Sequence, residues 1–221
     1  MGRISSFLFG WWNRKGPGRG IVRCSGRLQL RYLEPPDWNA FRDLERTNED
    51  WLAPWIPTPG PDRYSRERFV RQVRAAREQA RQGTYHRLGI FLAEGMDLVG
   101  SVTLSGVIHG AMWGCHAGYW IASEHAGQGL MPEALCLAFD FAFRDLSLHR
   151  VQLAIMPRNV ASRRVAEKLG LRDEGIARGY LKIAGKWEDH VRYAILADEY
   201  EARREDLYRV FVRPAAEGVF R

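Results

Sequence analysis

Residues 121–134 decide the fold of this chain, and they read IASEHAGQGLMPEA. The pattern predicts a strand that ends near Ile121 and runs through glycines into a helix that begins near Leu130. A helix N-terminus has unpaired N–H groups and the positive end of the helix dipole, and glycines let an anion approach the backbone. The stretch therefore predicts a site for a phosphate-bearing ligand. It lacks the Gly-Lys-Ser/Thr ending of an ATP phosphate loop, and Pro132 stands where a dinucleotide-binding loop needs its third glycine.

Hydrophobic periodicity on either side of this stretch predicts strands and helices in a mixed order. Strands are expected at residues 27–32, 85–92, 98–108, 113–121, 151–155, 171–181 and 190–196, and helices at 35–47, 65–82, 130–146 and 160–169. Short links between the second, third and fourth strands predict an antiparallel meander, and the next helix and strand complete a β-α-β unit. The fold class is therefore α/β or α+β, with mixed strand pairing.

The excess positive charge of the chain lies at its N-terminus. Residues 1–31 contain seven Arg and Lys and no acidic residue, which accounts for the whole net charge of +7. We expect a basic arm over residues 1–26, one domain over 27–200 and a C-terminal extension over 201–221. The arm could contact an anionic surface such as RNA, because attraction to phosphate does not depend on sequence. A flexible leader is the alternative.

Composition excludes several classes of protein. With 221 residues, 46% hydrophobic and 27% charged, the chain is globular rather than disordered, and no apolar stretch is long enough to span a membrane. Three widely spaced cysteines form neither a disulfide framework nor a thiolate metal site, and the six histidines lack zinc-site spacing. We expect a cytoplasmic protein with no metal.

The order of elements and the loop at Glu124–Gly129 resemble the GNAT N-acetyltransferase superfamily. Gly127 and Gly129 match the family motif Q/R-x-x-G-x-G/A, whereas Glu124 stands where Gln or Arg is usual. The resemblance implies a mixed, mostly antiparallel sheet of six to seven strands with helices on both faces and a splay between strands four and five. It also implies that backbone amides of this loop hold the pyrophosphate of acetyl-CoA.

One branch of this superfamily, the ribosomal-protein-alanine acetyltransferases of the RimJ and RimL type, is more similar still. The similar segments are residues 51–55, 127–135, 159–170 and 180–190, within a span of about residues 28–197. The branch implies the N-terminal α-amine of an alanine as the acetyl acceptor and a ribosomal protein as the partner. The basic arm and the tail after Tyr200 are not explained by the resemblance.

Candidate residues can be assigned to the cosubstrate and to the transfer step. The expected acetyl-CoA ligands are Ile121, Ala122, Ala126, Gly127, Gln128, Gly129, Leu130, Met131, Asn159 and Ser162. A free backbone N–H near Ile121 or Ala122 would polarise the thioester carbonyl if the strand splays, as the resemblance implies. Asn159 and Ser162, one helical turn apart, would orient the pantetheine arm and donate a proton to the leaving thiolate, and they are the expected catalytic residues. Capping of the helix at Val160 is the alternative role for Asn159.

No general base is assigned from the sequence. The relatives of the RimL type carry a Glu where this chain has Leu181, so that role does not transfer. Water, Glu124, His116, Tyr180 and His190 remain as candidates. An α-amine with a pKa near ~8 is partly neutral at physiological pH, whereas neutralising a lysine costs roughly 4 kcal/mol.

The acceptor end of the site is expected at Trp51, Trp55 and Tyr180, with packing beneath the first helices as the alternative role of the tryptophans. The leading hypothesis is N-terminal acetylation of a ribosomal protein. Acetylation of a small amine, such as an antibiotic or a polyamine, is an alternative that the nearby acids Glu45, Glu49 and Asp50 favour. A non-catalytic module that binds CoA or RNA is the third.

Overall fold

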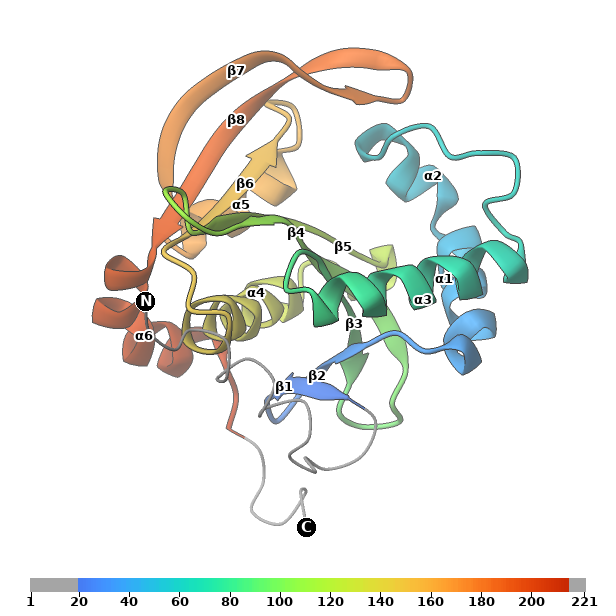
Figure 1. The fold of residues 1–221 in the computed structure, drawn as a ribbon, viewed down its shortest axis with the longest axis horizontal. Helices are drawn as coiled ribbons and strands as arrows, with labels where there is room; N and C mark the ends of the chain where they lie inside the picture. Colours follow the sequence, from blue (N-terminus) through green and yellow to red (C-terminus); the bar gives the residue numbers. More distant parts are fainter. Residues whose placement is uncertain (1–19, 215–221) are drawn as a thin grey trace, which may run out of the picture.

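The computed structural model describes residues 20–214, and eight strands in this part of the chain form one sheet (Figure 1). The strands are β1 (Ile21–Cys24), β2 (Leu28–Tyr32), β3 (His86–Leu92), β4 (Leu98–Ile108), β5 (Gly114–Ile121), β6 (Arg150–Ile155), β7 (Arg172–Ile183) and β8 (Lys186–Leu196). Their order across the sheet is β1-β2-β3-β4-β5-β6-β8-β7. Neighbouring strands are antiparallel except β5 and β6, which are parallel.

The parallel pair separates soon after it begins. Gly114, Cys115 and His116 of β5 pair with residues 150–152 of β6, and the rest of β5 has no partner on that side. Beyond this point β5 stays paired with β4, and β6 stays paired with β8. The splay between the fourth and fifth expected strands is therefore present, and it opens a gap in the sheet at the end of β5.

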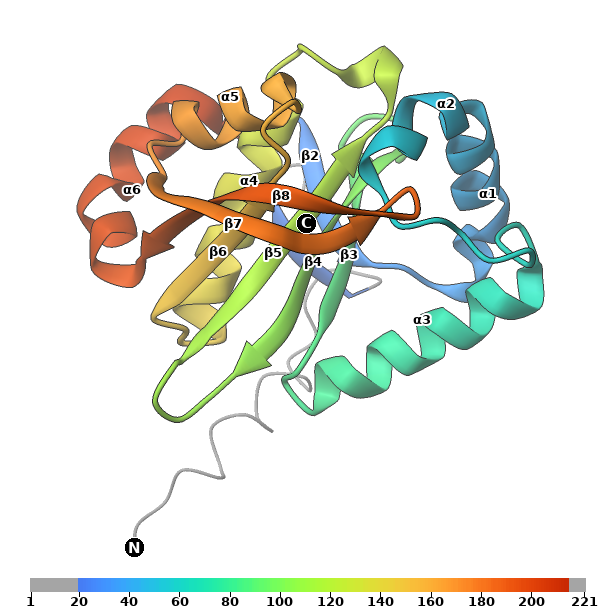
Figure 2. The same ribbon diagram turned by 90° about the horizontal axis from the view of Figure 1, so that it is seen from above.

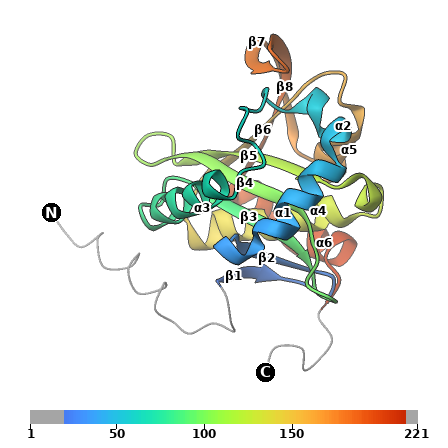
Figure 3. The same cartoon turned by 90° about the vertical axis from the view of Figure 1, so that its right-hand side faces the viewer.

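Helices cover both faces of the sheet (Figures 2 and 3). The helices are α1 (Trp38–Thr47), α2 (Glu49–Leu52), α3 (Arg66–Arg81), α4 (Leu130–Asp140), α5 (Val160–Lys168) and α6 (Ala197–Phe211), with 3-10 turns η1 (Pro35–Asp37), η2 (Ala53–Trp55) and η3 (Ser123–His125) and a π-helical turn η4 (Phe141–Asp145). α1 and α3 lie on one face, and α4 and α6 lie on the other. The long β7–β8 hairpin arches over the top of the sheet toward α2.

The helix after the glycine loop is the centre of the larger core. Every residue of α4 is buried, because its sequence LMPEALCLAFD is apolar on nearly all sides and the sheet and α6 enclose it. A smaller core lies between the sheet and helices α1 and α3, around Trp38, Phe41 and Phe69. The N-terminus of α4 is thus held in place by packing along the whole helix.

The mixed, mostly antiparallel fold is confirmed, but the sheet has eight strands rather than six to seven. The added strand is β1, whose four residues lie within the cationic N-terminal stretch and show no clear alternation. The sheet therefore begins before the expected domain start at residue 27. Helix α6 crosses the expected boundary at residue 200 and buries Tyr200 and Leu207 in the larger core. Most of the basic arm, residues 1–19, lies outside the described residues.

The described residues contain neither a membrane-spanning helix nor a cluster of metal ligands. Between residues 20 and 214, no helix combines the length and the apolar character needed to cross a bilayer. In the same part of the chain, no three His, Cys, Asp or Glu side chains gather in a way that would hold a metal ion.

The pH dependence of stability should depend on His86. The ring is buried, its Nδ1 lies 2.7 Å from the Tyr32 hydroxyl, and burial lowers its pKa from 6.5 to about 4. Between pH 6.5 and pH 4 this histidine is protonated in the unfolded chain and neutral in the folded chain. The free energy of unfolding therefore falls as the pH falls from 6.5 to 4. In urea titrations at several pH values, His86→Gln should lose about 3 kcal/mol less than the wild type between pH 7 and pH 4. Equal losses in the two proteins would contradict this assignment.

Candidate active site

The glycine loop presents a run of backbone amides with no acceptor. The N–H groups of residues 127–131 donate to no group among the described residues, and Pro132 has no N–H. Gly127 and Gly129 have φ of +76° and +77°, which turns the chain so that these amides converge ahead of α4. A Cβ at Gly127 would meet nothing within 4 Å, so the loop faces open space. This arrangement suits a phosphate or pyrophosphate. The amide of Ala126, by contrast, donates to the Ser123 carbonyl at 3.1 Å.

An ion pair between the partly exposed Arg27 and the buried Glu133 lies next to this loop. Glu133 in the first turn of α4 is fully buried, and its carboxylate accepts a hydrogen bond from Arg27 Nε at 2.7 Å. The Arg27 guanidinium also donates to the Gln128 carbonyl at 3.2 Å, and the Arg213 amide donates to Glu133 at 3.2 Å. Arg27 therefore offsets a negative charge that would otherwise oppose an anion at the helix N-terminus. Arg27 was not predicted as a site residue from the sequence, because it lies 106 positions from Glu133.

The gap in the sheet leaves backbone groups at the end of β5 without a partner strand. The Ala122 amide donates to the Val99 carbonyl at 2.9 Å, so it is not free, contrary to one of the two expected possibilities. The Ile121 pair with Gly100 lies between such bonds, so the N–H and C=O of Ile121 point away from β4, toward the gap. The Ile121 N–H has no acceptor among the described residues. Of the two, Ile121 is the amide that can polarise a carbonyl.

Two side chains from the α1–α2 elbow bind the end of β5. The Trp51 indole Nε1 donates to the Ile121 carbonyl at 3.0 Å. The buried Asn48 Oδ1 accepts a hydrogen bond from the Ser123 amide at 2.7 Å, and its Nδ2 donates to the Leu44 carbonyl at 3.0 Å. These bonds place Trp51, an expected acceptor residue, directly beside the free Ile121 amide. Asn48 was missed, because nothing in the local sequence shows a contact 75 residues away.

Helix α5 brings its first turn to the other side of the gap. Asn159 caps the helix, since its Oδ1 accepts the Ser162 amide at 3.0 Å, so the capping role is present. The Ser162 hydroxyl donates to the Tyr119 hydroxyl at 2.7 Å, and the Tyr119 hydroxyl donates to the Ser162 carbonyl at 3.2 Å. Burial raises the pKa of Tyr119 above its ordinary value, so the phenol keeps its proton. Tyr119 was missed, although its position two residues before Ile121 puts both on one face of β5.

The β7–β8 hairpin meets the loop after α2 across the acceptor end. The Ala184 amide at the hairpin turn donates to the Ile56 carbonyl at 3.1 Å, next to Trp55. Tyr180 lies on the same hairpin, with its ring 5.8 Å from that of His190. Trp55 and Tyr180 thus lie on two segments that contact each other. Trp51 lies on α2, shortly before Trp55 in the chain.

None of the candidate bases is singled out by its surroundings. His190 is buried, and its Nδ1 lies 3.0 Å from the Glu188 carbonyl. Burial and the charges of Arg192 and Arg150 lower the pKa of His116. Glu124 lies on the exposed turn beside His125, at 3.5 Å.

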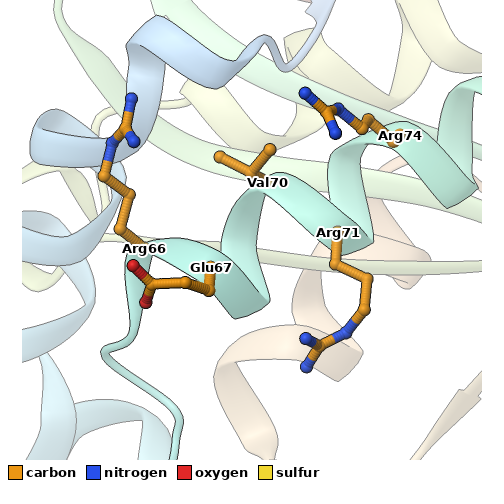
Figure 4. A pocket seen from close by; sticks show the side chains of 5 residues that line it. All are labelled: Arg66, Glu67, Val70, Arg71 and Arg74. Carbon is orange, nitrogen blue, oxygen red and sulfur yellow. The ribbon is translucent and has the colours of Figure 1, made fainter.

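The groove along α3 is a separate surface feature. It measures about 390 Å³ and is lined only by residues of that helix, Arg66, Glu67, Val70, Arg71 and Arg74. Figure 4 shows these side chains spread along one helix face rather than converging on a point. The groove contributes no residue to the gap described above.

Free amides ahead of α4 and at the end of a splayed strand, with a hydroxyl pair nearby, suit the transfer of an acyl group from a CoA thioester. The sequence matches the Acetyltransferase (GNAT) domain family over residues 27–172, and the chain belongs to this family. It is an acetyl-CoA-dependent N-acetyltransferase.

Individual relatives cover nearly all of the domain. The chain is 37% identical over 174 residues to the probable N-acetyltransferase YjcK of Bacillus subtilis, covering 79% of this chain and 96% of that protein. It is 30% identical over 178 residues to the [ribosomal protein uS5]-alanine N-acetyltransferase of Escherichia coli, covering 80% and 92%. The structure of Mycobacterium smegmatis RimJ in complex with CoA-disulfide superposes with a TM-score of 0.80 and 30% identity, covering 90% of this chain and 96% of that one.

The site residues fit this cosubstrate. The free amides of residues 127–131 suit a pyrophosphate, and the gap between β5 and β6 exposes the free Ile121 amide. When bound there, acetyl-CoA supplies an acetyl group activated as a thioester.

Substitution of Gly127 tests the position of the pyrophosphate. In Gly127→Val the new side chain would fill the open space before the amides and strain the positive φ, so CoA affinity measured by calorimetry should fall at least tenfold, about 1.4 kcal/mol. Gly175→Val is the matched control, since Gly175 also has a positive φ (+90°) and open space but lies on β7. Unchanged CoA affinity in Gly127→Val would move the pyrophosphate elsewhere.

Proposed function

We propose that this enzyme acetylates the N-terminal α-amine, with alanine as the first residue, of a ribosomal protein. The observation that carries the proposal is the hydrogen bond from Trp51 to the Ile121 carbonyl, which sets an aromatic wall of the acceptor opening against the free amide. We expect a small first residue to be favoured, because its side chain must pass Trp51 to bring the amine to the strand end. The similarity to the uS5-alanine enzyme of Escherichia coli supports the acceptor class.

The protonation state of the acceptor also favours an α-amine. The titratable groups near the site are buried, paired or on the exposed turn, as described for His190, His116 and Glu124. An α-amine has a pKa near ~8 and reaches its neutral form without a strong base, whereas a lysine side chain needs help worth roughly 4 kcal/mol. Proton loss to water therefore suffices for the proposed acceptor.

The chain's own residues can be given roles in the transfer. The Ile121 N–H would donate to the thioester carbonyl oxygen and stabilise negative charge on it. Ser162, held by the Tyr119 hydroxyl, would turn its own hydroxyl toward the leaving thiolate and give it a proton, and the proton that the attacking amine releases would return to the Ser162 oxygen through water. Asn159 fixes the first turn of α5, and so the position of Ser162.

The acidic residues near the tryptophans give a small polyamine acceptor less support than the sequence alone suggested. Glu45 and Glu49 both bind Arg63, at 3.4 and 3.6 Å, so one cation of the chain already offsets part of their charge. Asp50 alone of the three acids has no partner among the described residues. A weak contact of the basic arm with ribosomal RNA, and a cytoplasmic location, remain part of the proposal.

Mass spectrometry of an acetylated peptide tests the acceptor class. The peptide has a free N-terminal alanine and one internal lysine, and it is incubated with the enzyme and acetyl-CoA. Acetylation should appear on the α-nitrogen alone, and a peptide already blocked at its N-terminus should not react. Acetylation of the lysine, or of spermidine in preference to the peptide, would overturn the proposed acceptor.

The hydroxyl pair can be tested by single and double substitution. Ser162→Ala should lower kcat by about 10²-fold, the usual contribution of a positioned acid, and leave CoA affinity within a few-fold. Tyr119→Phe should also lower kcat. If the two hydroxyls act as one unit, the double variant loses no more than the worse single variant. Fully additive losses, or an unchanged kcat in Ser162→Ala, would separate the pair from proton transfer.

A further inference from the structure

A cation of the chain itself lies across the acceptor end of the site. Arg158, the residue before Asn159, donates from its guanidinium to Glu188 Oε2 on β8 at 2.7 Å. The same guanidinium lies 5.8 Å from the centre of the Trp55 ring. Glu188, Arg158 and Trp55 therefore form a row from the hairpin to the loop after α2.

The two outer members of this row form a binding site for a cation. Trp is the strongest aromatic partner for a cation, and a carboxylate adds a charge-assisted hydrogen bond. The hydrogen bond from Arg158 lowers the pKa of Glu188, so the carboxylate is ionised at neutral pH.

The cation that fills this site is only lightly held. The Arg158 side chain is half exposed, and among residues 20–214 Glu188 is its only ionic partner and Trp55 its only ring contact. Exposed pairs of this kind contribute little to stability, so Arg158 can leave for water at small cost. The site would then accept another cation of similar shape.

The reacting amine is not that cation. It must be neutral to attack a thioester, and a carboxylate beside it would hold it in the charged form. A permanently charged side chain farther along the acceptor has no such conflict. A guanidinium or an ε-ammonium fits, because Arg158 already shows that a guanidinium can be held there.

We infer that Glu188 and Trp55 bind an arginine or lysine side chain close to the N-terminus of the acceptor peptide, and that Arg158 occupies this site until the acceptor displaces it. The inference rests on the proposed function, since it requires a peptide acceptor. It adds a specificity site beyond the first residue, set by the charge of the second to fifth residues. It also gives Arg158 the role of an internal competitor rather than that of a binding residue.

The test uses peptides that differ by one charge. Each begins with alanine and carries a single arginine at position 2, 3, 4 or 5, and the reference peptide has glutamine at all four positions. For the wild type, arginine at one or two of these positions should lower KM at least fivefold with little change in kcat. The absence of any such preference would overturn the inference.

Two substitutions should shift KM in opposite directions. With the preferred arginine peptide, Glu188→Gln should raise KM at least fivefold, to the value of the glutamine peptide, whereas Arg158→Gln should lower KM, because the competitor is gone. An ion pair with a purely structural role would raise KM, or change nothing, in both variants. A preference for arginine that survives Glu188→Gln, or a higher KM in Arg158→Gln, would also overturn the inference.

Glu174→Gln provides the matched control. Glu174 lies on β7 of the same hairpin and binds Arg150, so its substitution breaks a similar pair away from Trp55 and should leave KM unchanged. Peptide binding to the CoA-bound enzyme, measured by calorimetry, gives the same comparison without turnover. If no peptide is acetylated but the binding preference is present, the proposed reaction fails while the cation site stands.

Discussion

The early separation of β5 from β6 is the constraint on which the active site depends. Each strand keeps its other neighbour, so the sheet divides into a half that follows β4 and a half that follows β8. Backbone N–H and C=O groups on an unpaired strand edge inside a protein raise the free energy of the fold, and a side chain here forms a hydrogen bond with one of them. Trp51 takes up the Ile121 carbonyl, whereas the Ile121 amide remains available. Among the described residues, the Ile121 amide at this opening thus has no acceptor and could donate to a carbonyl that develops negative charge.

The cosubstrate side of the site is fixed by packing rather than by the loop itself. The loop of residues 127–129 is short and glycine-rich, but it leads into a helix that is buried over its full length. Next to this loop, Arg27 forms an ion pair with the buried carboxylate of Glu133. Preorganised amides of this kind need little rearrangement when an anion binds, because the reorganisation has been made during folding.

Local features of the site were predictable from the sequence, and long-range ones were not. Gly127 and Gly129 follow from the need for positive φ and close backbone approach, and Asn159 follows from helix capping. Asn48, Tyr119 and Arg27 act through partners 43 to 106 positions away, which no local pattern reveals.

The fold shows the same division. Periodicity identifies six of the seven longer strands because each has at least one face in the core, whereas β7 is exposed over nearly all of its length. β1 was missed, since four residues are too few to show alternation and its pairing with β2 determines its conformation. The acidic residues near the tryptophans were correctly placed in one region, yet their pairing with Arg63 changes what that region can attract.

The two ends of the described chain share a support with the cosubstrate site. The Gly26 amide donates to the Arg213 carbonyl at 2.8 Å, the Arg213 amide donates to Glu133, and Arg27 binds the same carboxylate. A Cβ at Gly26 would lie 2.3 Å from the Pro214 carbonyl oxygen, so the two segments fit closely. Truncating the chain after residue 212, or fusing a folded domain directly after residue 214, would remove or strain the hydrogen bonds that Arg213 makes with Gly26 and Glu133. We therefore expect the affinity for CoA to depend on residues 213 and 214, although they lie far along the sequence from the glycine loop.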